Sequence, residues 1–192
     1  DLSAERPEPL VPRRRRFEIP ERSTPEGIED SVDEGAVRDV AAEIRECDAE
    51  SVAVSLLHAY ANPRNEQRVV DILETELDVP ISASHEVLAE FREYERTSTT
   101  VVDAYVTPAI DRYLGRLSQR AAETGLPEPL VMQANGGIAA IETVREHAVT
   151  TTMSGPAAGV VGANAAAGEV TEERGLHGLV TFDMGGTSSD VS

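Results

Sequence analysis

The side chains best suited to chemistry lie in one segment near the end of the sequence, residues 179–192. An apolar strand in this segment ends in a carboxylate, two glycines turn the chain, and a strand rich in hydroxyl groups follows. Glycine lets backbone N–H groups approach an anion closely, so that they form a nest for phosphate oxygens, and hydroxyl groups add further donors. The pattern predicts a nucleotide-phosphate site, with the binding candidates Gly185, Gly186, Thr187 and Ser188.

Two acidic residues belong to the same segment, Asp183 at the end of the strand and Asp190 after the turn. A carboxylate beside phosphate oxygens repels them unless a divalent cation lies between. We therefore expect Asp183 to be a catalytic Mg²⁺-shell ligand that binds the metal through water, and Asp190 to be a further catalytic candidate. The alternative is a plain β-hairpin with an Asp-x-Gly-Gly turn, which the two glycines alone would favour.

A second glycine turn follows a predicted strand at 130–133 and consists of Asn135, Gly136 and Gly137. These residue types tolerate positive φ, and α/β sheets bind ligands at the carboxyl ends of their strands. A ligand-lining role and a simple turn are therefore both open for these three residues.

The elements that must position these residues begin with a helix over 34–47, predicted from apolar residues at helical spacing. A short apolar run at 51–57 is typical of a buried strand. Asn62 and Pro63 then provide an N-cap and a first-turn proline for a second helix, and residues 79–84 form the next strand. Strand, helix and strand in this order predict a parallel crossover unit and an α/β fold.

A long helix is predicted over about 97–121, with Pro108 inside it. Because proline leaves the Ala104 carbonyl without its helical partner, we expect a kink or a break there. The remaining predicted elements are a helix at 141–146, a threonine-rich strand at 149–152, a helix of small residues capped by Ser154, and a strand at 178–183.

The charge composition limits the possible partners. The 192 residues carry a net charge of −18, and all 17 basic residues are arginine. The acidity argues against nucleic acid as a partner, and the lack of lysine excludes a P-loop and Schiff-base chemistry. A halophilic source and an ordinary acidic protein are the two interpretations of this surface. With no membrane-length apolar run and no signal segment, we expect a cytoplasmic protein that does not enter a membrane.

The four histidines show no metal-ligand spacing. His58 and His85 each follow a predicted strand, so a role in a pocket is one interpretation. Satisfied loop histidines are the interpretation that the sequence favours.

Sequence blocks along nearly the whole chain share the residues and order of one known family. They are 56–60 (LLHAY), 84–88 (SHEVL), 93–106 (EYERTSTTVVDAYV), 132–137 (MQANGG), 154–160 (SGPAAGV) and 182–190 (FDMGGTSSD). Together they closely resemble the hydantoinase A/5-oxoprolinase family, in particular its N-methylhydantoinase A-like members. The small-residue helix followed by a strand and Asp-x-Gly-Gly-Thr is also similar to the second phosphate motif of the actin-like ATPase superfamily.

The resemblance implies an α/β, ribonuclease H-like fragment of an actin-like ATPase domain, with a parallel or mixed sheet and packed helices. Residues 1–35 would be a connector or edge segment, 36–153 the α/β part of the first actin-like domain, and 154–192 the inter-domain helix with the second phosphate hairpin. The first phosphate hairpin of the family is absent from the sequence, so we expect an internal fragment. Because the family's helix approaches the nucleotide cleft, Gly155 becomes a nucleotide-binding candidate, although its small size also suits close helix packing.

The implied function is ATP- and Mg²⁺-dependent opening of a hydantoin or 5-oxoproline-like cyclic amide ring. Two alternatives are the ATP-binding subunit of an acetone- or acetophenone-type ketone carboxylase and a non-catalytic, chaperone-like nucleotide switch. The implied partners are the cyclic amide or ketone substrate and a hydantoinase B-like subunit, within an oligomeric parent protein. The fragment alone is expected to be inactive.

Overall fold

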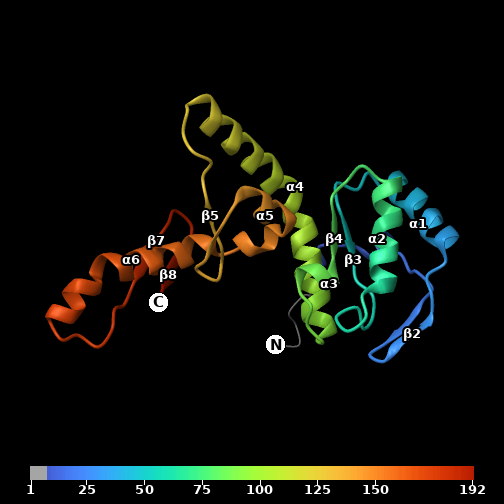
Figure 1. The fold of residues 1–192 in the computed structure, drawn as a ribbon, viewed down its shortest axis with the longest axis horizontal. Coiled ribbons are helices and arrows are strands. Elements are labelled where there is room, and N and C mark those ends of the chain that lie inside the picture. Colours follow the sequence, from blue (N-terminus) through green and yellow to red (C-terminus); the bar gives the residue numbers. More distant parts are fainter. Residues whose placement is uncertain (1–7) are drawn as a thin grey trace. The chain divides into compact units, whose positions relative to one another are not determined.

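The computed structural model describes residues 8–192 (Figure 1) in two compact units, of which the first ends at Ile110 and the second spans Asp111–Ser192. The start of the expected connector, residues 1–7, lies outside the described residues. The three-part division into 1–35, 36–153 and 154–192 stays a prediction.

A parallel strand pair with helices packed beside it forms the centre of the first unit. β3 (Val52–Val54) pairs with β4 (Ile81–Ala83) in parallel, and α2 (Arg64–Glu76) connects them. α1 (Glu34–Glu46) packs against α2, and both helices lie on one side of the strands in Figure 1. The predicted crossover unit and α/β fold class are confirmed.

The core of this unit lies between the two helices and β3. Apolar residues three and four apart on α1 and α2 face each other and are removed from water. This burial stabilises the fold by about 1.5–3 kcal/mol for each large side chain. Asp33 caps α1, because its carboxylate accepts a hydrogen bond from the Ala36 amide at 2.8 Å. The buried core residues are Val37, Ala41, Ile44, Val54, Val69, Ile72 and Leu73.

Short elements precede and follow this crossover unit. A 3₁₀ turn, η1 (Arg13–Arg15), leads to an antiparallel hairpin of β1 (Arg22–Thr24) and β2 (Gly27–Asp30). The buried side chain of Asn65 on α2 donates to the Asp30 carbonyl at 3.0 Å, which fastens the hairpin to the helix. One turn of helix, α3 (Ser84–Val87), follows β4 directly.

The long helix α4 (Glu93–Glu123) begins one turn earlier than the sequence predicts and continues through Pro108 without a break. The carbonyl that Pro108 leaves free is satisfied from outside the helix, since the Ser51 hydroxyl donates to the Ala104 oxygen at 2.5 Å. A tertiary hydrogen bond thus replaces the one that proline removes.

The second unit contains two short hairpins and three helical segments after α4. β5 (Val131–Met132) pairs with β6 (Ile138–Ala139), and β7 (Phe182–Met184) pairs with β8 (Ser189–Val191), both antiparallel. Between them lie α5 (Ile141–Glu146), the 3₁₀ segment η2 (Ala148–Thr151) and α6 (Ser154–Glu173). Within residues 8–192, no helix combines the length and the apolar character needed to cross a membrane.

The predicted threonine-rich strand at 149–152 is wrong, because this segment forms η2. Threonine is β-branched and favours strands, but here its hydroxyl groups bond to carbonyls three residues earlier. The hydroxyls of Thr150 and Thr151 donate to the carbonyls of His147 and Ala148, each at 2.7 Å. These bonds stabilise a tight helical turn and outweigh the strand preference.

Two predicted helix caps are also wrong. Pro63 rather than Asn62 occupies the N-cap position of α2, without a side-chain capping bond. Ser154 is already inside α6, whose N-cap residue is Met153 in a left-handed conformation with φ of 62°. The backbone turn at Met153 therefore starts this helix, and no serine cap is made.

Candidate functional site

The predicted strand–turn–strand is present as the β7–β8 hairpin. The Gly185 amide donates to the Ser188 carbonyl at 2.9 Å and closes a loop over residues 185–188. Within the described residues, the amide N–H groups of Gly186, Thr187 and Ser188 have no hydrogen-bond partner, and all four loop residues are exposed. The loop therefore offers three free backbone donors, which is what an anion nest requires.

The two candidate carboxylates form a pair. Asp183 and Asp190 lie directly opposite each other in the antiparallel register, so their side chains extend from the same face of the hairpin with Cβ atoms about 4.5–5.5 Å apart. Like charges at such positions repel each other, and a cation between them removes the repulsion. Asp183 is exposed and Asp190 is half-buried.

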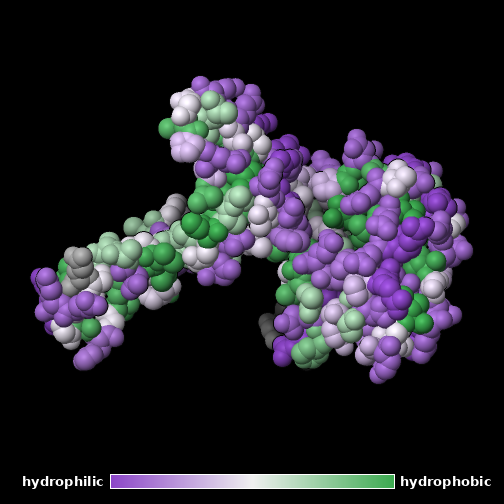
Figure 2. Space-filling model, in the orientation of Figure 1, coloured by the Kyte–Doolittle hydropathy of each residue, from purple (hydrophilic) through white to green (hydrophobic). Residues whose placement is uncertain are grey.

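The small-residue helix α6 lets the hairpin approach closely. A Cβ atom built on Gly159 would lie 3.4 Å from the Asp183 Oδ2 atom, so a longer side chain at this position would displace the carboxylate. Glycine at position 159 thus leaves room for the Asp183 carboxylate beside α6. Figure 2 shows further hydrophobic surface along α6, where Val160 and Val161 are partly exposed.

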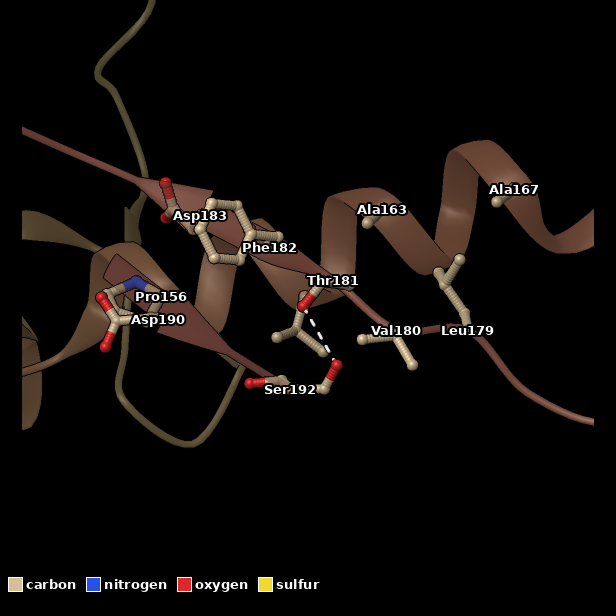
Figure 3. Close-up of a pocket in the computed structure, with 12 residues that line it drawn as sticks. Pro156, Ala163, Ala167, Leu179, Val180, Thr181, Phe182, Asp183, Asp190 and Ser192 are labelled. Carbon is tan, nitrogen blue, oxygen red and sulfur yellow. Dashed lines mark hydrogen bonds between the residues drawn. The ribbon is translucent and has the colours of Figure 1, made fainter. Parts of the chain in front are cut away.

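A pocket of about 410 Å³ lies between α6 and the hairpin. Figure 3 shows Asp183 and Asp190 at one end of it and Leu179 and Ala167 at the other. The other lining residues are Pro156, Gly159, Val160, Ala163, Val180, Thr181, Phe182 and Ser192. The pocket thus has apolar walls and a pair of carboxylates at one end.

The remaining candidates lie outside the residues that line this pocket. Gly155 is in the first turn of α6, and a Cβ atom built on it would meet nothing within 4 Å. Asn135, Gly136 and Gly137 form a tight turn in which Gly136 has φ of 82°, and the Gly137 amide donates to the Asn135 side-chain oxygen at 2.8 Å. A Cβ atom on Gly136 would be 3.4 Å from the Val161 side chain, so this turn touches α6.

The residues present suit Mg²⁺ better than a metal with an all-protein ligand set. Within the described part of the chain, no three histidine, cysteine, aspartate or glutamate residues group together as metal ligands. Mg²⁺ keeps several of its waters and binds through one or two carboxylates plus substrate phosphates. The Asp183–Asp190 pair beside the glycine loop has the carboxylate chemistry that such a site would need.

The sequence does not reveal a buried polar network in the first unit. Glu66, Ser84 and Arg96 have no solvent-exposed surface, and hydrogen bonds join Ser84 to both charged residues. The sequence favours satisfied loop histidines, but among the described residues the buried His58 Nδ1 and His85 Nε2 atoms have no hydrogen-bond partner. The signals in the sequence were the positions of both histidines after strands and within the family blocks.

Comparison with known proteins identifies the family. The family model for hydantoinase/oxoprolinase proteins matches residues 96–192, and the model for the N-terminal region of these proteins matches residues 2–77. The chain belongs to the hydantoinase/oxoprolinase family. Caprolactamase subunit alpha from Pseudomonas jessenii is 39% identical to it over 186 residues, which is 95% of this chain and 26% of that protein.

Solved structures of two ATP-dependent enzymes share the fold. The crystal structure of ATP-dependent caprolactamase from Pseudomonas jessenii matches with a TM-score of 0.85 at 36% identity. The match covers 100% of this chain and 28% of the caprolactamase chain. The nucleotide-free structure of acetone carboxylase matches with a TM-score of 0.84 at 31% identity, over 100% of this chain and 27% of the acetone carboxylase chain. The hydantoinase/oxoprolinase chain thus has the predicted mixed α/β fold of an actin-like ATPase fragment, and it spans about a quarter of the length of these relatives.

Proposed function

We propose that the full-length protein is an ATP-dependent hydrolase that opens a hydantoin or 5-oxoproline-like cyclic amide ring. The observation that carries the proposal is the opposed pair Asp183 and Asp190 beside a glycine turn with free amide groups. Family membership and the likeness to an ATP-dependent caprolactamase support it.

In this proposal the β7–β8 hairpin is one half of an ATP site. Asp183 would hold Mg²⁺ through water, with Asp190 opposite it. ATP would phosphorylate the amide oxygen, so that water could add to the carbonyl carbon, the ring C–N bond could break and phosphate could leave. The free amides of Gly186, Thr187 and Ser188 bind phosphate oxygens, aided by the two hydroxyl groups. Gly185 allows the turn, and its own amide is used within the loop. The chain's contribution is thus positioning and charge neutralisation, the main source of catalysis in phosphoryl transfer.

The other four predicted nucleotide contacts, Gly155 and the turn of Asn135, Gly136 and Gly137, are also part of this proposal, with different support. Gly155 lies in the first turn of α6, where unbonded helix N–H groups favour an anion. The amides of Gly136 and Gly137 already bond to Gln133 and Asn135. The Asn135–Gly137 turn would therefore touch the nucleotide through side chains or carbonyls.

A second candidate function is ATP-dependent activation of a ketone. The likeness to acetone carboxylase favours it, because that structure covers the whole chain with nearly the same TM-score as caprolactamase. Both candidates require the same phosphate hairpin, and they differ in substrate.

The partner subunit and the cellular location of the protein are also part of the proposal. The related caprolactamase chain is named as a subunit, which supports a partner subunit, of the hydantoinase B-like kind, and an oligomeric enzyme. We also propose a cytoplasmic location and, on the basis of the charge of −18, adaptation to concentrated salt.

The test is phosphate release by the full-length protein with its partner subunit, supplied with Mg²⁺ and ATP. Hydantoin, caprolactam, 5-oxoproline and acetone are each added alone. A cyclic amide should raise the rate by about tenfold or more, with ring-opened product formed in proportion to phosphate. Stimulation by acetone alone would favour the second candidate, and a rate that no substrate changes would contradict both and indicate a nucleotide switch.

A further inference from the structure

His85 is held by a fully buried carboxylate at the carboxyl end of the parallel strand pair. Glu66 on α2 accepts hydrogen bonds from the His85 amide and from its ring Nδ1 atom, both at 2.8 Å. Ser84 and the Leu56 amide donate to the same carboxylate at 2.9 and 2.6 Å. These four donors fix both the position of Glu66 and the orientation of the imidazole ring.

The bond to Glu66 also fixes the tautomer of His85. An ionised carboxylate can only accept hydrogen bonds, so the Nδ1 atom carries a proton. In the neutral form of the ring, Nε2 then presents a lone pair. A carboxylate behind a histidine that faces a ligand or metal has this effect in many sites.

Among the described residues, the Nε2 atom of His85 has no hydrogen-bond partner, although the side chain is only 9% exposed. The Glu86 Oε1 atom lies 3.6 Å from it, within ion-pair distance of a protonated ring but beyond hydrogen-bond distance, on a side chain that is 57% exposed. Buried polar atoms without partners are rare in native proteins, and each calls for a ligand, a water or a functional role. A ligand would reach Nε2 only if the exposed Glu86 side chain moved aside.

Arg96 holds the surrounding segments together but has no donor left for a ligand. Its guanidinium donates to the carbonyls of Leu56 and Glu90 at 3.0 and 2.7 Å, to Ser84 at 3.2 Å, and to the Glu93 carboxylate. The charges around Nε2 are thus two glutamates, Glu66 and Glu86, with no free cation in contact with the ring among the described residues. This environment disfavours an anion.

We propose that His85 Nε2 accepts the ring N–H of an uncharged cyclic amide, a lactam or a hydantoin. The location agrees, since β3 and β4 end at this point and α/β sheets bind ligands beyond the carboxyl ends of their strands. The inference rests on the proposed function and narrows its substrate class: 5-oxoproline carries a carboxylate, which Glu66 and Glu86 would repel. His85 is then a binding residue for substrate, separate from the phosphate hairpin.

The test is ¹⁵N NMR of the histidine rings, which needs no turnover. In the full-length protein, His85→Gln identifies the His85 ring signals by their loss, and single His→Gln variants at the other three histidines of this sequence identify theirs. The expected result is an Nδ1-protonated His85 whose Nε2 signal alone shifts when caprolactam or hydantoin is added. 5-Oxoproline at the same concentration should leave it unchanged. A ring protonated at Nε2, or a signal that saturating lactam does not move, would overturn the proposal.

Variants separate this inference from the ATP site. His85→Gln should weaken lactam binding by about tenfold, the value of one lost hydrogen bond, whereas His177→Gln, at an exposed position, should not change it. Asp183→Asn should lower ATP-dependent turnover at limiting Mg²⁺ yet keep the His85 shift. If the His85 shift is lost in Asp183→Asn, His85 and Asp183 do not have separate roles. If the shift is kept and turnover is normal, the phosphate site at Asp183 is contradicted and the role of His85 is not.

Discussion

Replacement of Arg96 by methionine tests whether the buried network holds the first unit together. Methionine keeps an unbranched stem of similar length and loses the charge. The Leu56 and Glu90 carbonyls would lose their donors, each at a cost of about 1–3 kcal/mol if it stays buried. The Glu93 carboxylate would lose its partner, but it is 40% exposed and can be hydrated. We expect a loss of about 2–6 kcal/mol from the two carbonyls together, out of a total stability of about 5–15 kcal/mol.

The assay is urea unfolding followed by circular dichroism, with the free energy of unfolding obtained by linear extrapolation. Arg92→Met is the matched control, because Arg92 also pairs with a glutamate three residues away, Glu95, but both side chains are at least half exposed. That exposed pair should contribute about 0–1 kcal/mol. Equal, small losses in the two variants would refute the view that Arg96 organises the segments around His85.

Two further predictions concern backbone strain and a surface ion pair. Gly136→Ala should destabilise the protein by about 1–2 kcal/mol in thermal unfolding, because alanine disfavours a positive φ. The control Gly115→Ala, in open space on α4, should stabilise the protein by about 0.5–1 kcal/mol. Equal effects of the two substitutions would contradict the positive-φ turn at Gly136. The hydrogen bond from Arg68 holds the pKa of Glu34 below its ordinary value of 4.5, so its stabilisation is present above that pH and is lost as the pH falls through the lowered pKa. Melting temperatures measured from pH 6 to 2 should therefore fall less steeply below pH 4.5 for Glu34→Gln than for the wild type, and parallel curves would contradict the shift.

Periodicity predicts the parts of this fold that depend on local pattern. The sequence correctly predicts the helices α1 and α2 from their apolar spacing, and it also predicts the two short strands β3 and β4. Each of these elements buries one face or one run of residues, which leaves a pattern in the sequence. The β7–β8 hairpin is likewise predicted from its two glycines and flanking strands. The pairing of Asp183 with Asp190 follows only from the register, which the hydrogen bonds of the hairpin determine.

The errors arise where tertiary contacts or hydroxyl groups outweigh local preference. η2 forms because threonine hydroxyls bond to nearby carbonyls, and α4 continues through Pro108 because Ser51, more than fifty residues away, supplies the missing donor. Sequence patterns assign charged residues to the surface, so the complete burial of Glu66 and Arg96 could not be anticipated. Their partners lie on separate elements that only the fold brings together.

The Mg²⁺ dependence of ATP turnover in Asp183→Asn tests the central claim most directly. The variant keeps the size of the side chain and removes the charge opposite Asp190. The measurement uses the full-length protein with its lactam or hydantoin substrate and compares this variant with Glu172→Gln, an exposed carboxylate on α6. We predict that half-maximal activity in Asp183→Asn requires about 10- to 100-fold more Mg²⁺, as for the loss of an outer-shell partner, and that Glu172→Gln matches the wild type. An unchanged Mg²⁺ requirement in Asp183→Asn would contradict the assignment of this hairpin as the metal and phosphate site.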